Sequence, residues 1–402
     1  MASVNYKALV ESCSKLGPKP ASRLLGQALK EKAYRPHDFD FGRLFEECFG
    51  SHAFKVCRNS ASSVDPDVSI VRTMEAAGAT STAAFSNISG QIVYSAIMDK
   101  YENEEFVFTK LIPVIDTKLN GEKIAGITRI GDEALEVEEG GEFPLVGVSE
   151  TYIHTPITKK RGLRVALTKE AVFFDRTGVL LDRAGEGGEY LGLNKEKRAI
   201  DVVIDENAGA VSAMTGGHRY HWRDTSIATY GNNSGTHTWD NLEASNGLVD
   251  WTDVQSAWLL LKAMTDPDTG EPTNFMPKHL IVTPQNQWTA MRIKRATNTR
   301  THVGGYATSG NLVEFEAPSP IPFEFDIVSS QQLASRLATD THWFLGDIGR
   351  ACRYMQNWPM QILQAPAMME DEFRRDIITQ FRVSERGAFA TFEPRALIQN
   401  TA

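Results

Sequence analysis

The chain of 402 residues has no run of about 18 apolar residues, which is the length that a membrane-spanning helix needs. It has only four cysteines, and their spacing is not that of a disulfide framework or a zinc site. Its N-terminus lacks the basic head and apolar stretch of a secretory signal. These absences predict a soluble, intracellular protein that has no membrane partner.

Catalytic motifs are also missing. The chain contains no GxSxG nucleophile elbow, no HExxH zinc motif and no P-loop. Residues 212–250, rich in Gly, Asn and Thr, are expected to form a long loop-rich stretch. Its His218, His221 and His237 could bind a metal ion, but no nearby cysteine or helical spacing supports them. The sequence therefore predicts no enzyme, no cofactor and no metal site, and this loop is expected to make subunit contacts.

The net charge of −9 argues against binding nucleic acid over the whole surface. One local exception is a basic cluster in the segment MRIKRATNTR. Its members are candidate DNA-facing residues: Arg292, Lys294, Arg295 and Arg300. The alternative for such a cluster is a solvated face or a subunit contact.

The most informative pattern is a pair of alternating, strand-like limbs between residues 122 and 167. The first limb is acidic and the return limb ends in basic residues. A long two-stranded ribbon is only marginally stable alone, so we expect this one to find its partner on another chain. The glutamates could instead hold a cation, or pair across the two strands. Candidate interface residues are Glu136, Glu138, Glu139, Glu142, Lys159, Lys160, Arg161 and Arg164, together with Arg374 and Arg375 further along the chain.

Apolar periodicity and turn residues predict the remaining elements. The long helix expected at 181–207 should bend near its start, because Gly185, Gly187 and Gly188 weaken it. Helices are expected at 6–16, 21–33, 41–49, 87–101 and 181–207, a helix with a Thr252–Gln255 capping box, a strand at 279–283, a helix opened by Pro284, and a hairpin turn at the sequence SERG. The small and polar residues of 58–86 predict an extended arm, with a flexible linker as the alternative. This order of elements fits an α+β body with projecting segments.

Several stretches between Phe85 and Leu397 carry a family resemblance by their order and spacing. They include FSNISGQIVYSAIMDKY, GITRIGDEALEVEEGGEFP, TPITKKRGLRVALTKEAVFFDRTG and DEFRRDIITQFRVSERGAFATFEPR. Together they resemble the major capsid proteins of tailed bacteriophages, which have the Hong-Kong-97-type fold. The resemblance implies a helical segment and arm at 1–86, a peripheral domain at 87–121 and 168–208 with a long spine helix, an extended ribbon loop at 122–167, an axial domain at 209–359 and a return to the peripheral domain at 360–402.

The resemblance also implies the function. The chain is expected to assemble as hexamers and pentamers into an icosahedral shell around double-stranded DNA, within a virion assembled in the host cytoplasm. Portal, scaffolding and decoration proteins are the further partners that it implies. Two alternatives stay open at this point: an encapsulin-like compartment that encloses protein cargo, and a soluble hydrolase with an unrecognised site.

Overall fold

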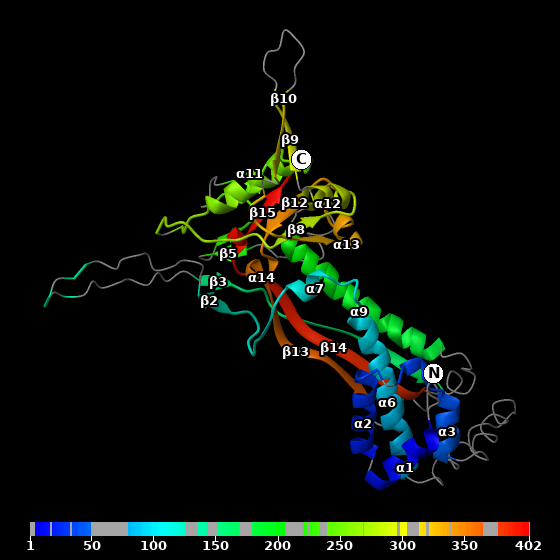
Figure 1. Cartoon of the computed structure of the whole chain (residues 1–402). Helices are drawn as coiled ribbons and strands as arrows, with labels where there is room; N and C mark the ends of the chain where they lie inside the picture. Colours follow the sequence, from blue (N-terminus) through cyan, green and yellow to red (C-terminus); the bar gives the residue numbers. More distant parts are fainter. Residues whose placement is uncertain are drawn as a thin grey trace. The chain divides into compact units, whose positions relative to one another are not determined.

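The computed structural model forms two compact units, each with a core of its own (Figure 1). Unit 1 comprises Met1–Glu104, Lys160–Asn194 and Trp358–Arg386, and unit 2 comprises Glu105–Lys159, Lys195–Asn357 and Gly387–Ala402. Within the described ranges, none of the helices has the length and apolar character that a membrane crossing requires. The structure describes residues 5–16, 18–32, 34–49, 79–125, 136–137, 139–140, 142, 152–168, 179–205, 220–222, 225–232, 239–267, 269–295, 298–303, 313–318, 321–337, 339–364 and 377–401.

In unit 1, three N-terminal helices pack around a fourth (Figure 1). They are α1 (Tyr6–Leu16), α2 (Pro18–Lys30) and α3 (Phe41–Phe49), and the fourth is α6 (Ala79–Tyr101). Leu25, Leu29 and Leu44 are buried in one core with Ile88 and Ile92. The N-terminal helices are therefore part of the core of unit 1.

The arm expected at 58–86 is partly wrong, because 79–86 belongs to α6. The alanines of that stretch are strong helix formers and extend the helix eight residues before the predicted start. The rest of the expected arm lies outside the described residues.

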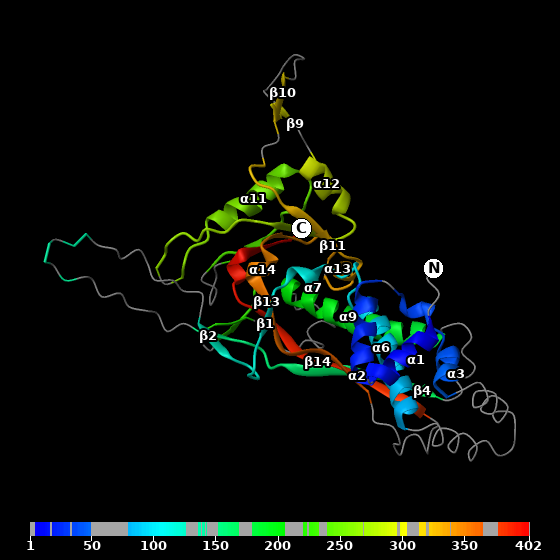
Figure 2. The same cartoon turned by 60° about the horizontal axis from the view of Figure 1, so that its bottom comes forward.

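Four strands form one sheet in the order β1 (Val114–Asp116), β13 (Cys352–Gln364), β14 (Ile377–Thr391) and β4 (Lys159–Thr168). β1 runs parallel to β13, and Figure 2 shows β4 alongside β14. Leu163 and Val165 of β4 pack into the core of unit 1 with Phe381 and Val383 of β14. Because side chains alternate along a strand, the residues between them lie on the opposite face.

The hairpin turn predicted at SERG, residues 384–387, is wrong. β14 continues through this sequence to Thr391 as a single strand. A Cβ atom at Gly387 would lie 2.4 Å from the hydroxyl oxygen of Tyr354 and 2.7 Å from the carbonyl oxygen of Met355. The glycine therefore allows a close approach between neighbouring strands rather than a turn.

The long helix α9 (Val179–Ile204) has 26 residues and is about 39 Å long at the usual rise of 1.5 Å per residue. It is not interrupted at the glycines where a bend was expected. Instead, these glycines let α9 pack closely against its neighbours. A Cβ atom at Gly188 would lie 2.3 Å from the carbonyl oxygen of Ile97 in α6.

Unit 2 is built on a five-stranded sheet in the order β11 (Asp326–Ser329), β8 (His279–Val282), β12 (Trp343–Gly346), β15 (Leu397–Asn400) and β7 (Leu242–Glu243). Every residue of β12 and β15 is buried. Helices α11 (Trp251–Lys262) and α12 (Gln287–Arg295) pack on this sheet. The short helices α7 (Phe108–Leu111), α13 (Gln331–Ala334) and α14 (Ile348–Ala351) complete the unit. β15, the last described strand, thus lies inside this sheet. The resemblance grouped 360–402 with the peripheral domain, and that grouping stays a prediction.

Both helices on the sheet start differently from the prediction. The N-cap of α11 is Asp250, whose Oδ1 accepts a hydrogen bond from the Thr252 amide at 2.7 Å. Asp253 completes the capping box by accepting from the Asp250 amide at 2.9 Å. The predicted box of Thr252 and Gln255 is therefore wrong by two residues, because an aspartate already caps the helix end. Pro284 lies in a turn before α12 rather than in its first position.

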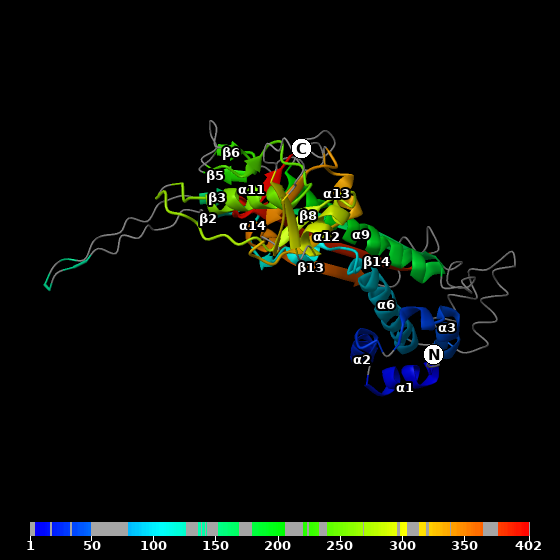
Figure 3. The same ribbon diagram turned by 45° about the horizontal axis from the view of Figure 1, so that its top comes forward.

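Two smaller sheets complete unit 2. β2 (Lys123–Ala125), β3 (Tyr152–His154), β5 (Tyr220–Trp222) and β6 (Thr225–Ile227) form one of them, and Figure 3 shows β5 and β6 next to β3. β9 (Asn298–Val303) and β10 (Val313–Pro318) pair as an antiparallel hairpin. The loop-rich stretch expected at 212–250 thus contributes strands as well as loops, and its buried Asn241 donates to the carbonyl oxygens of Thr229 and Pro394.

The packing of α9 gives a testable prediction. Replacing Gly188 by alanine should lower the free energy of unfolding by about 1–3 kcal/mol, because the carbonyl of Ile97 belongs to a helix backbone and cannot move aside cheaply. Gly187→Ala is the matched control. Its Cβ would lie at ordinary contact distances from side chains alone, 3.4 Å from Leu163 and 3.9 Å from Val165, so it should be neutral or stabilise by up to about 1 kcal/mol. Urea unfolding of both variants, followed by circular dichroism, measures the difference, and equal effects would contradict the packing argument.

Candidate assembly surfaces

The acidic limb begins on a well-anchored base. Lys123 and Ile124 of β2 pair with His154 and Ile153 of β3. Just before β2, the Asn120 carboxamide oxygen accepts a hydrogen bond from the Thr158 amide at 3.1 Å. Beyond this base, three of the predicted glutamates are exposed, namely Glu136, Glu139 and Glu142. The fourth, Glu138, lies outside the described residues.

The basic residues expected on the return limb lie on β4, which is an edge strand of the larger sheet. Lys160 and Arg164 are exposed and have the opposite parity to the core residues Leu163 and Val165. Lys159 is exposed at the first position of the strand, and Arg161 is half-buried on the core-facing side. The four cations are therefore not on one surface. Arg374 and Arg375 lie outside the described residues.

These positions bear on the predicted ribbon. β2 of the first limb pairs antiparallel with β3 of the return limb, as a ribbon requires, whereas β4, further along the return limb, pairs with β14 in a different sheet. The strand that carries the cations of the return limb therefore does not belong to the ladder that joins the two limbs. A continuous two-stranded ribbon was expected because both limbs alternate, but alternation does not say which strand is the neighbour.

A further cation was missed in the sequence. Arg382 of β14 is exposed and lies between the core residues Phe381 and Val383, so it has outward parity on the strand next to β4. We call Lys160, Arg164 and Arg382 the basic sheet face. Among the described residues of β4, β13 and β14, no carboxylate has this outward parity. The alternation around Arg382 is readable in the sequence, but its neighbourhood to β4 is not.

The predicted DNA-facing cluster divides between two elements. Arg292, Lys294 and Arg295 are exposed in the last turns of α12. The Lys294 ammonium lies 3.3 Å from a carboxylate oxygen of Asp326. Arg300 lies on β9, opposite Glu316 in the hairpin register.

The histidines give no cluster in the described part of the chain. His221 lies in β5, and His218 and His237 are outside the described residues. Among the residues that the structure places, no group of three or more His, Cys, Asp or Glu side chains could hold a metal ion.

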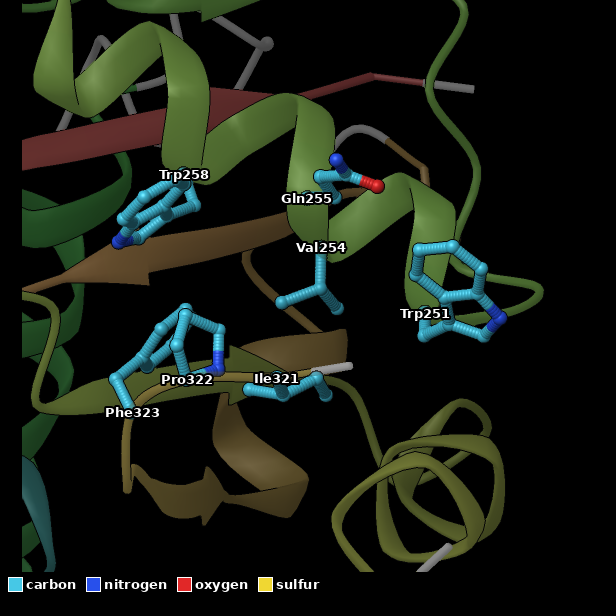
Figure 4. A pocket seen from close by; sticks show the side chains of 7 residues that line it. All are labelled: Trp251, Val254, Gln255, Trp258, Ile321, Pro322 and Phe323. Atoms are coloured by element: carbon cyan, nitrogen blue, oxygen red, sulfur yellow. The ribbon is translucent and has the colours of Figure 1, made fainter. Parts of the chain in front are cut away.

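An apolar groove of about 110 Å³ lies between α11 and the segment that precedes β11 (Figure 4). Its aromatic side chains are close together, since the rings of Trp258 and Phe323 stack with their centroids 6.2 Å apart. No lining side chain is an acid, a base or a nucleophile, so the groove offers no catalytic group. It is lined by Trp251, Val254, Gln255, Trp258, Ile321, Pro322 and Phe323.

One buried ion pair holds the end of α9 to the segment after α13. An oxygen of Asp201 lies 3.2 Å from a guanidinium nitrogen of Arg336, and both side chains are buried. Burial raises the pKa of the Asp201 carboxyl from its ordinary 3.8 to about 6, and the charge of Arg336 offsets part of this effect. The pair gives unit 2 an internal group that titrates near neutral pH.

Residues 153–400, more than half of the chain, match the model of a family described as phage capsid protein, and the chain therefore belongs to this family. Similar solved structures include the capsid of the cyanophage P-SCSP1u, at 13% identity over 74% of this chain and 88% of that chain, with a TM-score of 0.46. A virus-like particle from Pyrococcus furiosus is 12% identical over 77% and 98% of the two chains, with a TM-score of 0.41. The holo-SrpI encapsulin complex of Synechococcus elongatus PCC 7942 is 11% identical over 73% of this chain and 89% of that chain, with a TM-score of 0.39. No curated protein matches this sequence.

Because these TM-scores are all below 0.5, the assignment of the chain to the capsid family rests on the family match alone. It confirms the predicted resemblance to phage capsid proteins, and with it the function as a capsid shell protein of a virion. The α+β class is confirmed by the structure, and the capsid fold by the family. The match begins at residue 153, so the stretches quoted from Phe85 onward that precede it lie outside the match. The division into peripheral, ribbon and axial parts stays a prediction.

The ion pair predicts a pH dependence. Because the pKa of Asp201 is higher in the folded chain than in the unfolded chain, folding takes up a proton between about pH 4 and pH 7, and stability contributed by this group falls as pH rises through that range. In Asp201→Asn this component of the slope should vanish, although the absolute stability falls because Arg336 loses its partner. Urea unfolding at several pH values measures the slope. Asp340→Asn, at an exposed position, is the matched control, and equal slopes in wild type and Asp201→Asn would contradict the assignment.

Proposed function

We propose that copies of this chain assemble as hexamers and pentamers into an icosahedral shell around double-stranded DNA. We further propose that the acidic segment of one copy, defined by Glu136, Glu139 and Glu142, binds the basic sheet face of the next. The observation that carries this proposal is the separation of opposite charges along the chain: the exposed glutamates lie in none of the described strands, whereas the exposed cations lie on β4 and β14. A chain that belongs to a shell-forming family can satisfy both surfaces at once by contacting two neighbours.

The expected strength of this contact suits a shell that corrects its errors. An exposed ion pair contributes about 0–1 kcal/mol, so one pair alone would not hold two subunits together. Three pairs repeated around a shell act together, because each bound neighbour raises the effective concentration of the next contact. Such contacts weaken as salt rises, since the Debye length is about 10 Å at 0.1 M ionic strength.

We assign the two units to the two domains that capsid chains of this type are expected to have. Unit 1 would be the peripheral domain. Its support is the first part of α9, up to Asn194, which shares the core of unit 1 with Phe381 and Val383 of β14. Unit 2 would be the axial domain that closes the rings. The strands β2 and β3 would be the base of the extended loop, in keeping with their short pairing and the exposed glutamates that follow.

The role is structural rather than catalytic in this proposal. Its support is the family match together with the groove on α11, whose lining has no titratable side chain. We also propose that the subunit assembles in the host cytoplasm and contacts portal, scaffolding and decoration proteins.

Charge reversal tests the contact. Glu136→Lys/Glu139→Lys/Glu142→Lys should raise the chain concentration needed for assembly by about tenfold or more, if each lost pair contributes about 0.5 kcal/mol. Lys160→Glu/Arg164→Glu/Arg382→Glu should do the same, and the chain that carries all six changes should recover. Light scattering and negative-stain electron microscopy measure the threshold and the particles.

The matched control is Glu11→Lys/Glu31→Lys/Glu47→Lys, which makes the same charge change at exposed positions in α1, in the turn after α2 and in α3. Charges on β4 also have a simpler use, because charged edge strands resist edge-to-edge aggregation. Charge reversal keeps the edge strand charged and therefore keeps that protection. If the Lys160→Glu/Arg164→Glu/Arg382→Glu chain assembled normally, protection against aggregation would be the role of the basic sheet face, and the proposed subunit contact would be rejected. Absence of recovery in the six-fold variant would also reject the proposed pairing.

The cargo is tested separately. Shells purified from bacteria that express the chain together with the phage packaging components should contain nuclease-protected double-stranded DNA. Shells that hold protein cargo and no DNA would instead favour a compartment of the encapsulin kind.

A further inference from the structure

Helix α12 carries an exposed face that its packing does not explain. The helix buries Ala290 and Ile293 against unit 2. On the other side, Trp288 is 78% exposed, and Arg292 and Arg295 are exposed as well. With 3.6 residues per turn, positions 288, 292 and 295 fall within about 60° of one another around the axis. One tryptophan and two arginines thus share one face of the helix, which we call the α12 face.

The structure separates Lys294 from this face. Its ammonium lies 3.3 Å from a carboxylate oxygen of Asp326 and 5.7 Å from the centre of the Phe325 ring. By contrast, the Arg292 guanidinium donates a hydrogen bond to the hydroxyl of Thr289 within the helix, at 3.3 Å. Because this partner is neutral, it does not balance the charge of Arg292. The helix sequence QWTAMRIKR contains no carboxylate. Of the cations predicted from the sequence, two therefore remain on this face, and Trp288 joins them.

Helix stability accounts for only part of this arrangement. Cations in the last turn of a helix interact favourably with its dipole, by about 0.3–1 kcal/mol each. That argument covers Arg292 and Arg295 and does not reach Trp288, which lies in the first turn. A single exposed apolar side chain is common on protein surfaces, but Trp288 is informative because it shares its face with two exposed arginines.

We propose that the α12 face binds nucleic acid, with Arg292 and Arg295 on phosphates and Trp288 against a base or sugar. Residues 288–295 span about 10 Å of helix axis, which is the rise of about three nucleotides of one strand. Aromatic side chains next to cations are the usual composition of such sites, because the rings cover bases while the cations neutralise the backbone.

This inference rests on the proposed function, in which the shell encloses DNA. A neighbouring subunit is the competing occupant, and the charge distribution favours nucleic acid. In the proposed assembly the exposed glutamates of the acidic segment are bound to the basic sheet face of unit 1. A phosphate backbone supplies the negative charge that the α12 face needs. The net charge of −9 belongs to the chain as a whole and does not prevent a local basic face from binding phosphates.

The test uses the unassembled full-length chain and a fluorescein-labelled oligonucleotide, as a single strand and as the duplex. Binding is measured by anisotropy between about 0.05 and 0.2 M salt, where each phosphate contact contributes a slope of about 0.9 in log affinity against log salt on duplex DNA. Arg292→Gln/Arg295→Gln should lower that slope by about 1.8. Arg292→Lys/Arg295→Lys should keep it, because the charges remain. Trp288→Ala should weaken single-strand binding roughly fivefold or more while leaving the slope unchanged.

The control for charge is Lys7→Gln/Lys15→Gln, which removes two exposed cations from α1. A slope that falls as much in this control, or that stays unchanged in Arg292→Gln/Arg295→Gln, overturns the proposal. An unaltered single-strand affinity in Trp288→Ala removes the tryptophan from the site. Electron microscopy of the same variants separates this proposal from the assembly proposal. Normal shells are expected, and a loss of shells in Arg292→Gln/Arg295→Gln would make the α12 face a subunit contact instead.

Discussion

The close approach of α9 to α6 is the constraint on which unit 1 depends. At Gly188 the helix has no room for even a methyl group, because the backbone of Ile97 occupies the space. One residue earlier, a Cβ atom at Gly187 would lie 3.4 Å from Leu163 on β4. The same turn of α9 therefore supports the helix that the N-terminal helices cover and the strand that carries the basic sheet face. The core thereby holds β4 in an orientation that leaves Lys160 and Arg164 exposed.

The charges of this protein acquire a meaning through that placement. Pairing glutamates and lysines within one ladder would stabilise a single chain and leave little for a neighbour. Here the described glutamates lie outside the described strands, whereas Lys160, Arg164 and Arg382 lie on β4 and β14. In the proposed assembly, each chain therefore offers an acidic segment to one neighbour and a basic face to another. Weak contacts of this kind suit a family whose members build shells, because many must form together before a particle is stable.

Sequence periodicity predicted the elements well where one chain segment makes its own pattern. The helices at 6–16 and 41–49 have the predicted bounds, and a buried strand begins at His279 as expected. Sequence periodicity failed where a residue is determined by its packing against a neighbour that is distant in the sequence. SERG reads as a turn, yet Gly387 is there because the Tyr354 ring approaches it. The glycines of α9 read as a weak point, yet they are the contact surface of the helix.

The candidate surfaces divide in the same way. Residue types and spacing alone determined the α+β class, the family resemblance and the presence of an acidic and a basic limb, because these are properties of local composition and order. Only the tertiary structure decided that β4 lies beside β14, that Arg382 joins Lys160 and Arg164, and that Lys294 turns to Asp326 while Trp288 stays in solvent. The physical reason is that strand neighbours and helix faces are selected by the burial of apolar side chains across the whole unit, which no single segment records.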